Sequence, residues 1–215
     1  MLVLSGVLVA PWLVPGLARS FVDWVNGPQA VATTRQQTPD PSVLPEPVHA
    51  LPGALLSGPT RRQLRAWHRD AGRPERVVVP RLQVASAVLP ISGNSGVLLP
   101  PSDPQEIGWW QEGPRAGARR GTTVLTGHTV HTGGGAFDNL GELVPGDVVR
   151  VGTSEGTLRY RVVRVRDYRT GALAREARRI FRLTGPGRLL LITCSDWTGT
   201  MYLSNTVVTA VPALR

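Results

Sequence analysis

The sequence predicts an all-β domain, a barrel or a sandwich, over residues 76–215, and two observations support this. From Arg76 onward, short runs rich in β-branched residues alternate with turns and add up to about eight strands. Patterns typical of helices are few, and no alternation of strands with helices indicates a nucleotide-binding fold. A chain of 215 residues is long enough for one such domain with a real core plus additional segments.

The predicted strands are short apolar or alternating runs. In chain order they include 77–80, 82–84, 121–126, 147–151, 158–166, 189–193 and 202–211. Ser154, Glu155 and Gly156 are typical of a hairpin turn between the fourth and fifth of these runs. In the fifth run, the period-two alternation slips at Val162 and Val163, which indicates a β-bulge.

The first 26 residues are predicted to form an uncleaved membrane anchor. Residues 1–18 contain no charged side chain, and Arg19 follows them. A secretory signal is the alternative, although no basic residue precedes the apolar run and no clear Ala-x-Ala cleavage site follows it.

Residues 27–75 are predicted to form a linker between this anchor and the β domain. Seven prolines fall between Pro28 and Pro59, among Thr, Gln and Ser residues. Such a segment buries too little apolar surface to offset its ordering entropy, so we expect it to be extended. Residues 60–69 form either a short helix or part of the tether.

The chain is strongly basic, with 24 Lys+Arg against 15 Asp+Glu and a net charge of +9. Every one of these basic residues is arginine. A basic surface suits an anionic cell wall, an anionic lipid or nucleic acid, and it is also compatible with a merely solvated surface. No helix-turn-helix, zinc-finger or aromatic RNA-binding pattern occurs, so we expect no nucleic-acid partner.

Cys194 is the only cysteine, and it ends the apolar run 189–194. It therefore has no partner for an intramolecular disulfide and lacks the further cysteines of most thiolate metal sites. Asp103, Glu106 and Glu112 also form no defensible set of metal ligands, so we expect no metal or other cofactor. Cys194 is then either an inert buried thiol or a nucleophile.

A nucleophilic cysteine needs a nearby base or imidazolium, because the thiolate is the attacking species. Of the four histidines, His49 and His68 lie in the linker region and are expected to be solvated. His128 directly follows a predicted strand and a glycine, so it is the candidate partner of Cys194. A hydrogen-bonded surface role is the alternative for His128, and His131 either lines the same cleft or faces solvent.

These motifs together resemble those of the sortases, the membrane-anchored cysteine transpeptidases of Gram-positive bacteria. Residues 126–128 (TGH) resemble the family's histidine motif, and 191–194 (LITC) match its Leu-x-Thr-Cys motif. Between them, residues 137–147 resemble a Phe-x-x-Leu-x-x-Leu-x-x-Gly-Asp segment that packs and turns the barrel. The runs HTVHTGGG and TCSDW are similar to those of the actinobacterial class F sortases.

This resemblance implies a fold, a reaction and a location. The fold would be an eight-stranded closed β-barrel with short helices, preceded by the anchor and linker. Cys194 would attack an LPxTG-like sorting signal to form a thioacyl intermediate, with His128 as its acid. An amine of a cell-wall precursor or pilin, or water, would resolve the intermediate. The enzyme would lie on the extracellular face of the cell membrane, in the cell envelope.

One position departs from the resemblance. Sortases place an arginine on the last strand, facing the cysteine, but no arginine lies between Cys194 and Arg215. The expected position falls on Asn205, whose amide can donate a hydrogen bond to an oxyanion, or on Leu203, which cannot. The third possibility is an arginine from the preceding loop, for which Arg178, Arg179 and Arg182 are the candidates.

Thr193 is a further candidate for contact with the substrate carbonyl, through its hydroxyl or its backbone N–H. Its alternative role is that of an ordinary β-branched strand residue. The missing arginine also leaves open a catalytically weak or inactive envelope binding module built on the same barrel. A papain-type hydrolase is disfavoured, because such enzymes place the cysteine at a helix start and ahead of the histidine.

Overall fold

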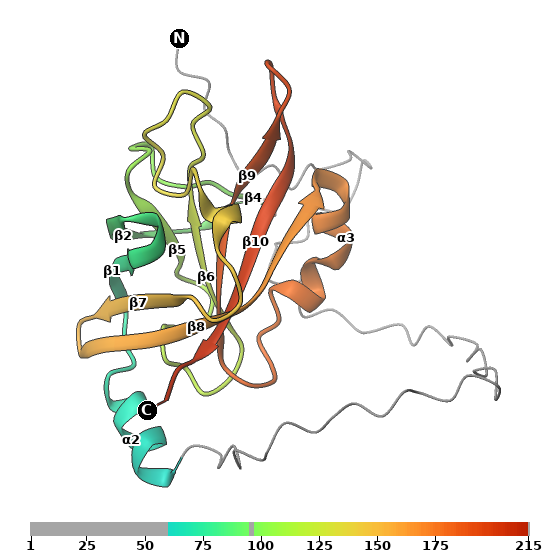
Figure 1. Cartoon of the computed structure of the whole chain (residues 1–215). Helices are drawn as coiled ribbons and strands as arrows, with labels where there is room; N and C mark the ends of the chain where they lie inside the picture. The colour runs from blue at the N-terminus through green and yellow to red at the C-terminus, as the bar shows by residue number, and fades with distance from the viewer. Residues whose placement is uncertain (1–59, 95–96, 215) are drawn as a thin grey trace, which may run out of the picture.

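Eight strands close into a barrel in the computed structural model, which describes residues 60–94 and 97–214 (Figure 1). Around the barrel the order is β1-β2-β5-β6-β9-β10-β8-β7. The strands are β1 (Pro74–Val79), β2 (Val84–Ile91), β5 (Ile107–Trp110), β6 (Thr122–Gly127), β7 (Val148–Thr153), β8 (Gly156–Arg169), β9 (Arg188–Trp197) and β10 (Tyr202–Pro212). The predicted closed eight-stranded barrel is confirmed. The predicted anchor and most of the predicted linker lie outside the described residues.

The neighbouring strands are antiparallel except for two pairs, β2–β5 and β6–β9, which are parallel. Parallel strands require a long crossover connection, and here residues 128–187, with β7 and β8 among them, link β6 to β9. A separate two-stranded sheet pairs β3 (Gly93–Asn94) with β4 (Val97–Leu98). In the parallel β6–β9 pair, His128 directly follows β6 and Cys194 lies on β9 at the same end of the sheet.

The side chains of β9 alternate between two separate apolar cores. Leu189 and Leu191 point into the barrel and pack in its interior core. Leu190 and Ile192 point outward and belong to a second core on the outer face of the barrel. The β9 segment is therefore apolar on both faces, which explains why it reads as a continuous hydrophobic run.

Helix α3 (Thr170–Ile180) covers this outer face (Figure 1). Its buried residues Leu173, Ala177 and Ile180 recur at the spacing of one helix face, and they pack in the outer core. Prediction from sequence treated this segment as a loop, and that was wrong. The usual start signal is missing, because the N-cap position is Arg169 and makes no side-chain capping bond.

Helix α2 (Arg61–Arg69) decides between the two roles predicted for residues 60–69. Thr60 and Gln63 form a reciprocal capping box that satisfies backbone donors at the helix start. Trp67 is buried in the interior core and meets the ring of Tyr160 edge-on, with centroids 4.9 Å apart. The segment is therefore a helix packed on the barrel. On this helix the ring of His68 is half-buried and bonds to the Gly117 carbonyl, so the expectation that its side chain is solvated was wrong.

Several local predictions are confirmed. The register between β8 and β10 shifts between Thr209 and Ala210, opposite Arg164 and Val162, which places the bulge at Val163. β7 and β8 join at the predicted hairpin turn. Phe137, Leu140 and Leu143 are buried in the interior core, as expected for a segment that packs the barrel.

Within residues 60–94 and 97–214, no helix has both the length and the apolar character needed to cross a membrane.

Candidate active site

Three polar side chains form a row across the neighbouring strands β6, β9 and β10. The last registered pair of the parallel strands β6 and β9 joins Thr126 to Ile192. His128 and Cys194 each follow two residues later, so they occupy equivalent positions at the same end of the sheet. On the other side of β9, Asn205 pairs directly with Cys194.

Cys194 and Asn205 share the outer face of the sheet because side chains alternate along a strand, and His128 directly follows β6 at the same end of the sheet. Cys194 follows Leu190 and Ile192 at spacings of two and lies in the same outer core. Val124 on β6 and Val207 on β10 belong to that core as well, which assigns the even-numbered positions of β6 and the odd-numbered positions of β10 to this face. Two long-range strand pairings thus bring together residues that are 66 and 11 positions apart in sequence.

Cys194 is nearly enclosed, with 6% of its surface exposed. Burial raises the pKa of its thiol to about 11, because a thiolate loses hydration there. The hydroxyl of Tyr202 lies close enough that a charge on Cys194 contributes to raising the pKa of that phenol, after the effect of burial. Without substrate, the sulfur is therefore held as a neutral thiol.

His128 is also buried, and its ring has a fixed orientation. Its Nε2 donates a hydrogen bond to the carbonyl oxygen of Pro101, at 2.7 Å. A carbonyl oxygen only accepts, so the proton sits on Nε2, and Nδ1 is the basic nitrogen of the neutral ring. The backbone carbonyl of His128 accepts from the N–H of Phe137, at 3.0 Å, which anchors the histidine to the segment that closes the barrel.

Gly127 places the histidine by allowing a close approach. A Cβ at this position would lie 2.7 Å from the ring of Phe137, so any larger residue would push the two segments apart. The hydroxyl of Thr193 donates to the Gly127 carbonyl at 2.9 Å and lies 2.7 Å from the hydroxyl of Thr129. Thr193 is thus engaged in tying the end of β6 to β9, next to the cysteine.

Asn205 is the polar side chain that the structure places beside the sulfur. Its Nδ2 lies 3.9 Å from the Cys194 Sγ and 3.4 Å from the Thr193 carbonyl oxygen. Its Oδ1 is buried and has no hydrogen-bond partner among the described residues. Leu203 shares this face of β10, two residues away, and is 42% exposed.

Two of the loop arginines that could have replaced the missing arginine lie elsewhere. Arg179 pairs with Glu176 near the C-terminal end of α3. Arg182 lines a groove that also contains Arg188, at the opposite end of β9 from Cys194. Burial raises the pKa of the Cys194 thiol.

Aromatic side chains form a rim beside this row that the sequence did not reveal. His131 stacks on Trp197, with centroids 4.4 Å apart and planes 10° from parallel. Trp197 in turn meets Tyr202 at 4.8 Å. His131 is therefore an exposed rim residue that joins the loop after His128 to the β9–β10 hairpin.

Asp138 stabilises the loop after His128 through hydrogen bonds that a motif search could have suggested. Its carboxylate accepts from the N–H of Val130 at 2.7 Å and from the N–H of Gly135 at 2.9 Å. An aspartate that follows a glycine run is a common loop-forming signal. The contact of Pro101 with His128 carries no such signal, because it uses a backbone carbonyl 27 residues away.

A family model described as a sortase domain matches residues 77–213. This stretch covers nearly the whole barrel together with the row of His128, Cys194 and Asn205. No curated protein matches the chain.

Several solved sortases share the fold. Sortase C-1 from Actinomyces oris superposes with a TM-score of 0.52 at 24% identity, over 65% of this chain and 73% of that one. Sortase A from Corynebacterium diphtheriae gives 0.52 at 16% identity, over 66% and 61% of the two chains. A pilus-related sortase C of Group B Streptococcus gives 0.51 at 17% identity, over 65% and 66%. At these identities the likeness concerns the fold.

Proposed function

The chain belongs to the sortase family, and we propose that it is a cysteine transpeptidase that acts through Cys194. The substrate would be the LPxTG-like sorting signal of a secreted protein, and the acceptor an amine of a cell-wall precursor or pilin, or water. The observation that carries this proposal is that Asn205 pairs with Cys194, while His128 directly follows the neighbouring parallel strand β6 at the same end of the sheet.

The proposed reaction has two acyl-transfer steps. The Cys194 thiolate attacks the carbonyl carbon of the Thr–Gly bond, and the C–N bond breaks to leave a thioester. His128, as imidazolium, gives the Nδ1 proton to the departing amine, while Nε2 keeps its bond to Pro101. The acceptor amine then attacks the thioester carbonyl and returns a proton to His128, and the thiolate leaves.

The buried thiol makes the first step demanding. Because burial raises the pKa of Cys194 to about 11, the thiolate is the minor form near neutral pH. Attack thus requires either this small fraction or a change in the surroundings of the sulfur when substrate binds. Pro101 and Leu98 are the neighbours whose movement would matter, since one holds His128 and the other packs in the same core as Cys194.

Asn205 is proposed to hold the substrate where other sortases use an arginine. Its Nδ2 is directed at the sulfur, and its buried Oδ1 has no partner among the described residues, so a substrate N–H could bond to it. A neutral amide stabilises an oxyanion less than a guanidinium does, which predicts a slower enzyme. Thr193 is proposed to position the cysteine strand through its hydroxyl bond to Gly127.

The location follows from the family, whose members are cell-envelope enzymes. We propose that residues 1–26 anchor the protein and that the part of the segment 27–75 that precedes α2 spans the distance to the catalytic barrel, on the extracellular face. The runs HTVHTGGG and TCSDW support a place within class F. The alternative is an inactive binding module, favoured by the absence of an arginine from the last strand.

Mass spectrometry of the protein mixed with an LPxTG peptide tests the proposal. We expect an acyl adduct on Cys194, and we expect Cys194→Ala to lose the adduct and all cleavage while keeping its melting temperature. His131→Ala is the matched control, because that ring lies on the rim and should leave the adduct intact. Cleavage retained by Cys194→Ala, or no adduct in a folded wild type across several sorting motifs, would contradict the mechanism and favour the binding module.

A further inference from the structure

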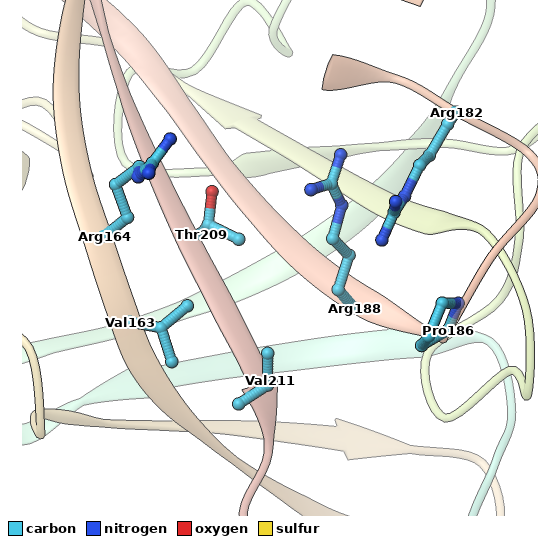
Figure 2. Close-up of a pocket in the computed structure, with 8 residues that line it drawn as sticks. Val163, Arg164, Arg182, Pro186, Arg188, Thr209 and Val211 are labelled. Atoms are coloured by element: carbon cyan, nitrogen blue, oxygen red, sulfur yellow. The ribbon is translucent and has the colours of Figure 1, made fainter. Parts of the chain in front are cut away.

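A groove lies on the outer face of the barrel, at the end of β9 opposite Cys194. It has a volume of about 340 Å³ and lies between β8, β9, β10 and the segment after α3 (Figure 2). The residues that define it are Arg164, Arg182, Arg188, Thr209, Val163 and Val211. Arg188 and Cys194 share one face of β9 and are six residues apart, which is about 20 Å at about 3.3 Å per residue.

Three guanidinium groups from different elements surround the groove, and no carboxylate lines it. Arg164 comes from β8, Arg188 from the start of β9, and Arg182 from the connection after α3. Figure 2 shows Arg182 and Arg188 with their guanidinium groups close together, and Arg164 across the groove beside the hydroxyl of Thr209. None of the three forms an ion pair with a carboxylate among residues 60–94 and 97–214.

Arg188 is held in place by the fold. Its Nε donates to the Thr122 hydroxyl at 3.0 Å, and its Nη2 donates to the carbonyls of Arg179 and Ile180 at 2.9 and 2.7 Å. These bonds fix the guanidinium and leave Nη1 for another acceptor. The Nε of Arg182 is also buried and has no hydrogen-bond partner within the described part of the chain.

The like charges repel one another in this arrangement. The pKa of Arg188 is lowered to about 10, first by burial and then by the charges of Arg182 and Arg179. A bound anion would remove this repulsion and accept the donors that remain. A smaller adjoining cavity shares Arg164, Arg188 and Thr209 and adds Arg166, so the positive charge extends along β8.

We propose that the groove of Arg164, Arg182 and Arg188 binds the phosphate group of a phosphate ester. Phosphate fits better than carboxylate, because it offers more oxygens to the forked donors of arginine and, as a monoester, also carries more charge. The apolar side chains of Val163 and Val211 line the other part of the groove (Figure 2). They would contact the organic group attached to the phosphate, which inorganic phosphate lacks.

Calorimetric titration of the full-length chain in 0.15 M NaCl tests this site. The probes are inorganic phosphate, glycerol 3-phosphate and acetate, and salt at this level screens loosely held surface charge. We expect one glycerol 3-phosphate per chain, weaker binding of inorganic phosphate and none of acetate. The double variant Arg164→Gln, Arg182→Gln should weaken binding at least about tenfold, as the loss of two charge-assisted contacts implies.

Arg150→Gln is the matched control, because it removes the same charge from an exposed position on β7 that does not line the groove. This control should bind like the wild type, and the melting temperatures of all variants verify folding. Equal weakening by Arg150→Gln would overturn the site in favour of diffuse attraction. No phosphate binding, or binding unchanged in the double variant, would also overturn it.

Two sources of the phosphate ester can be separated by sedimentation with vesicles. If the phosphate belongs to a lipid headgroup, the chain should sediment with phosphatidylglycerol vesicles more than with phosphatidylcholine vesicles. The double variant should lose this preference. Because the N-terminal segment can itself bind vesicles, only the difference between the double variant and Arg150→Gln counts. Glycerol 3-phosphate binding without that difference assigns the site to a soluble or polymer-borne phosphate ester.

Discussion

The two ends of the outer face of β9 place polar side chains in different environments. At one end, Cys194 is buried, and burial raises the pKa of its thiol to about 11. At the other end, Arg188 is half-buried, and three hydrogen bonds hold its guanidinium in place. One strand face thus carries both a desolvated thiol and a fixed cation.

Helix α3 packs on the same outer face, where Leu173 and Ala177 share an apolar core with Leu190 and Ile192 of β9. The C-terminal carbonyls of the helix then accept from Arg188, where the helix dipole favours positive charge. Arg188 is six residues from Cys194 along β9, about 20 Å, and the proposed chemistry at the cysteine end is assigned to His128 and Asn205.

The largest effect on activity is expected from the removal of His128, the proposed acid. His128→Ala should lower kcat/KM for an LPxTG peptide by about 10²- to 10⁴-fold, because the leaving amine would depart without its proton. Steady-state cleavage assays measure this. Turnover close to that of the wild type would transfer the role to His131, which His131→Ala then tests directly.

The next largest effect on activity concerns the arginine that is missing from the last strand. Leu203→Arg should raise kcat by about tenfold, since it adds a cationic donor on the face of Cys194. Asn205→Ala should lower kcat/KM by about ten- to a hundredfold through loss of its amide. Single-turnover acylation rates separate the two effects. If Leu203→Arg fails to accelerate acylation while the protein stays folded, position 203 does not face the oxyanion.

A smaller effect is expected in the pH dependence of Cys194 alkylation. The alkylation rate of Cys194 by iodoacetamide should rise about tenfold per pH unit from pH 7 to 10, with an apparent pKa near 11. Because the folded pKa exceeds the ordinary value of 9.0, this thiol stabilises the fold below pH 9, and its contribution is lost as the pH rises toward 11. Tyr202 interacts electrostatically with Cys194, and His128 is its proposed partner, so variants of either residue need their own pH profiles. A midpoint near pH 7 would mean that His128 already stabilises the thiolate.

Much of the barrel was predictable from the sequence because its signals are local. The run 189–194 is apolar enough to be a strand buried on both faces, and β9 contains it. The slip at Val163 is a break in a period of two, which only a bulge accommodates. The hairpin at residues 154–155 follows from turn residues between two alternating runs.

Helix α3 and the role of Pro101 were not predictable, for physical reasons. The helix lacks a capping side chain at its start, and its burial depends on the outer face of β9, which is far away in sequence. Pro101 acts through a backbone carbonyl, which every residue possesses. Neither feature can be recognised from the local residue pattern.

The sequence by itself determined the eight-stranded barrel and the two residues on which the proposed chemistry rests, Cys194 and His128. Only the tertiary structure decided that Asn205 lies beside the sulfur, that Arg179 and Arg182 do not, and that a basic groove occupies the far end of the same strand face. The reason is that residue type and strand periodicity can be recognised in a short stretch of sequence. Which side chains become neighbours depends on strand register and on the return path of α3, and these are set by packing over the whole barrel.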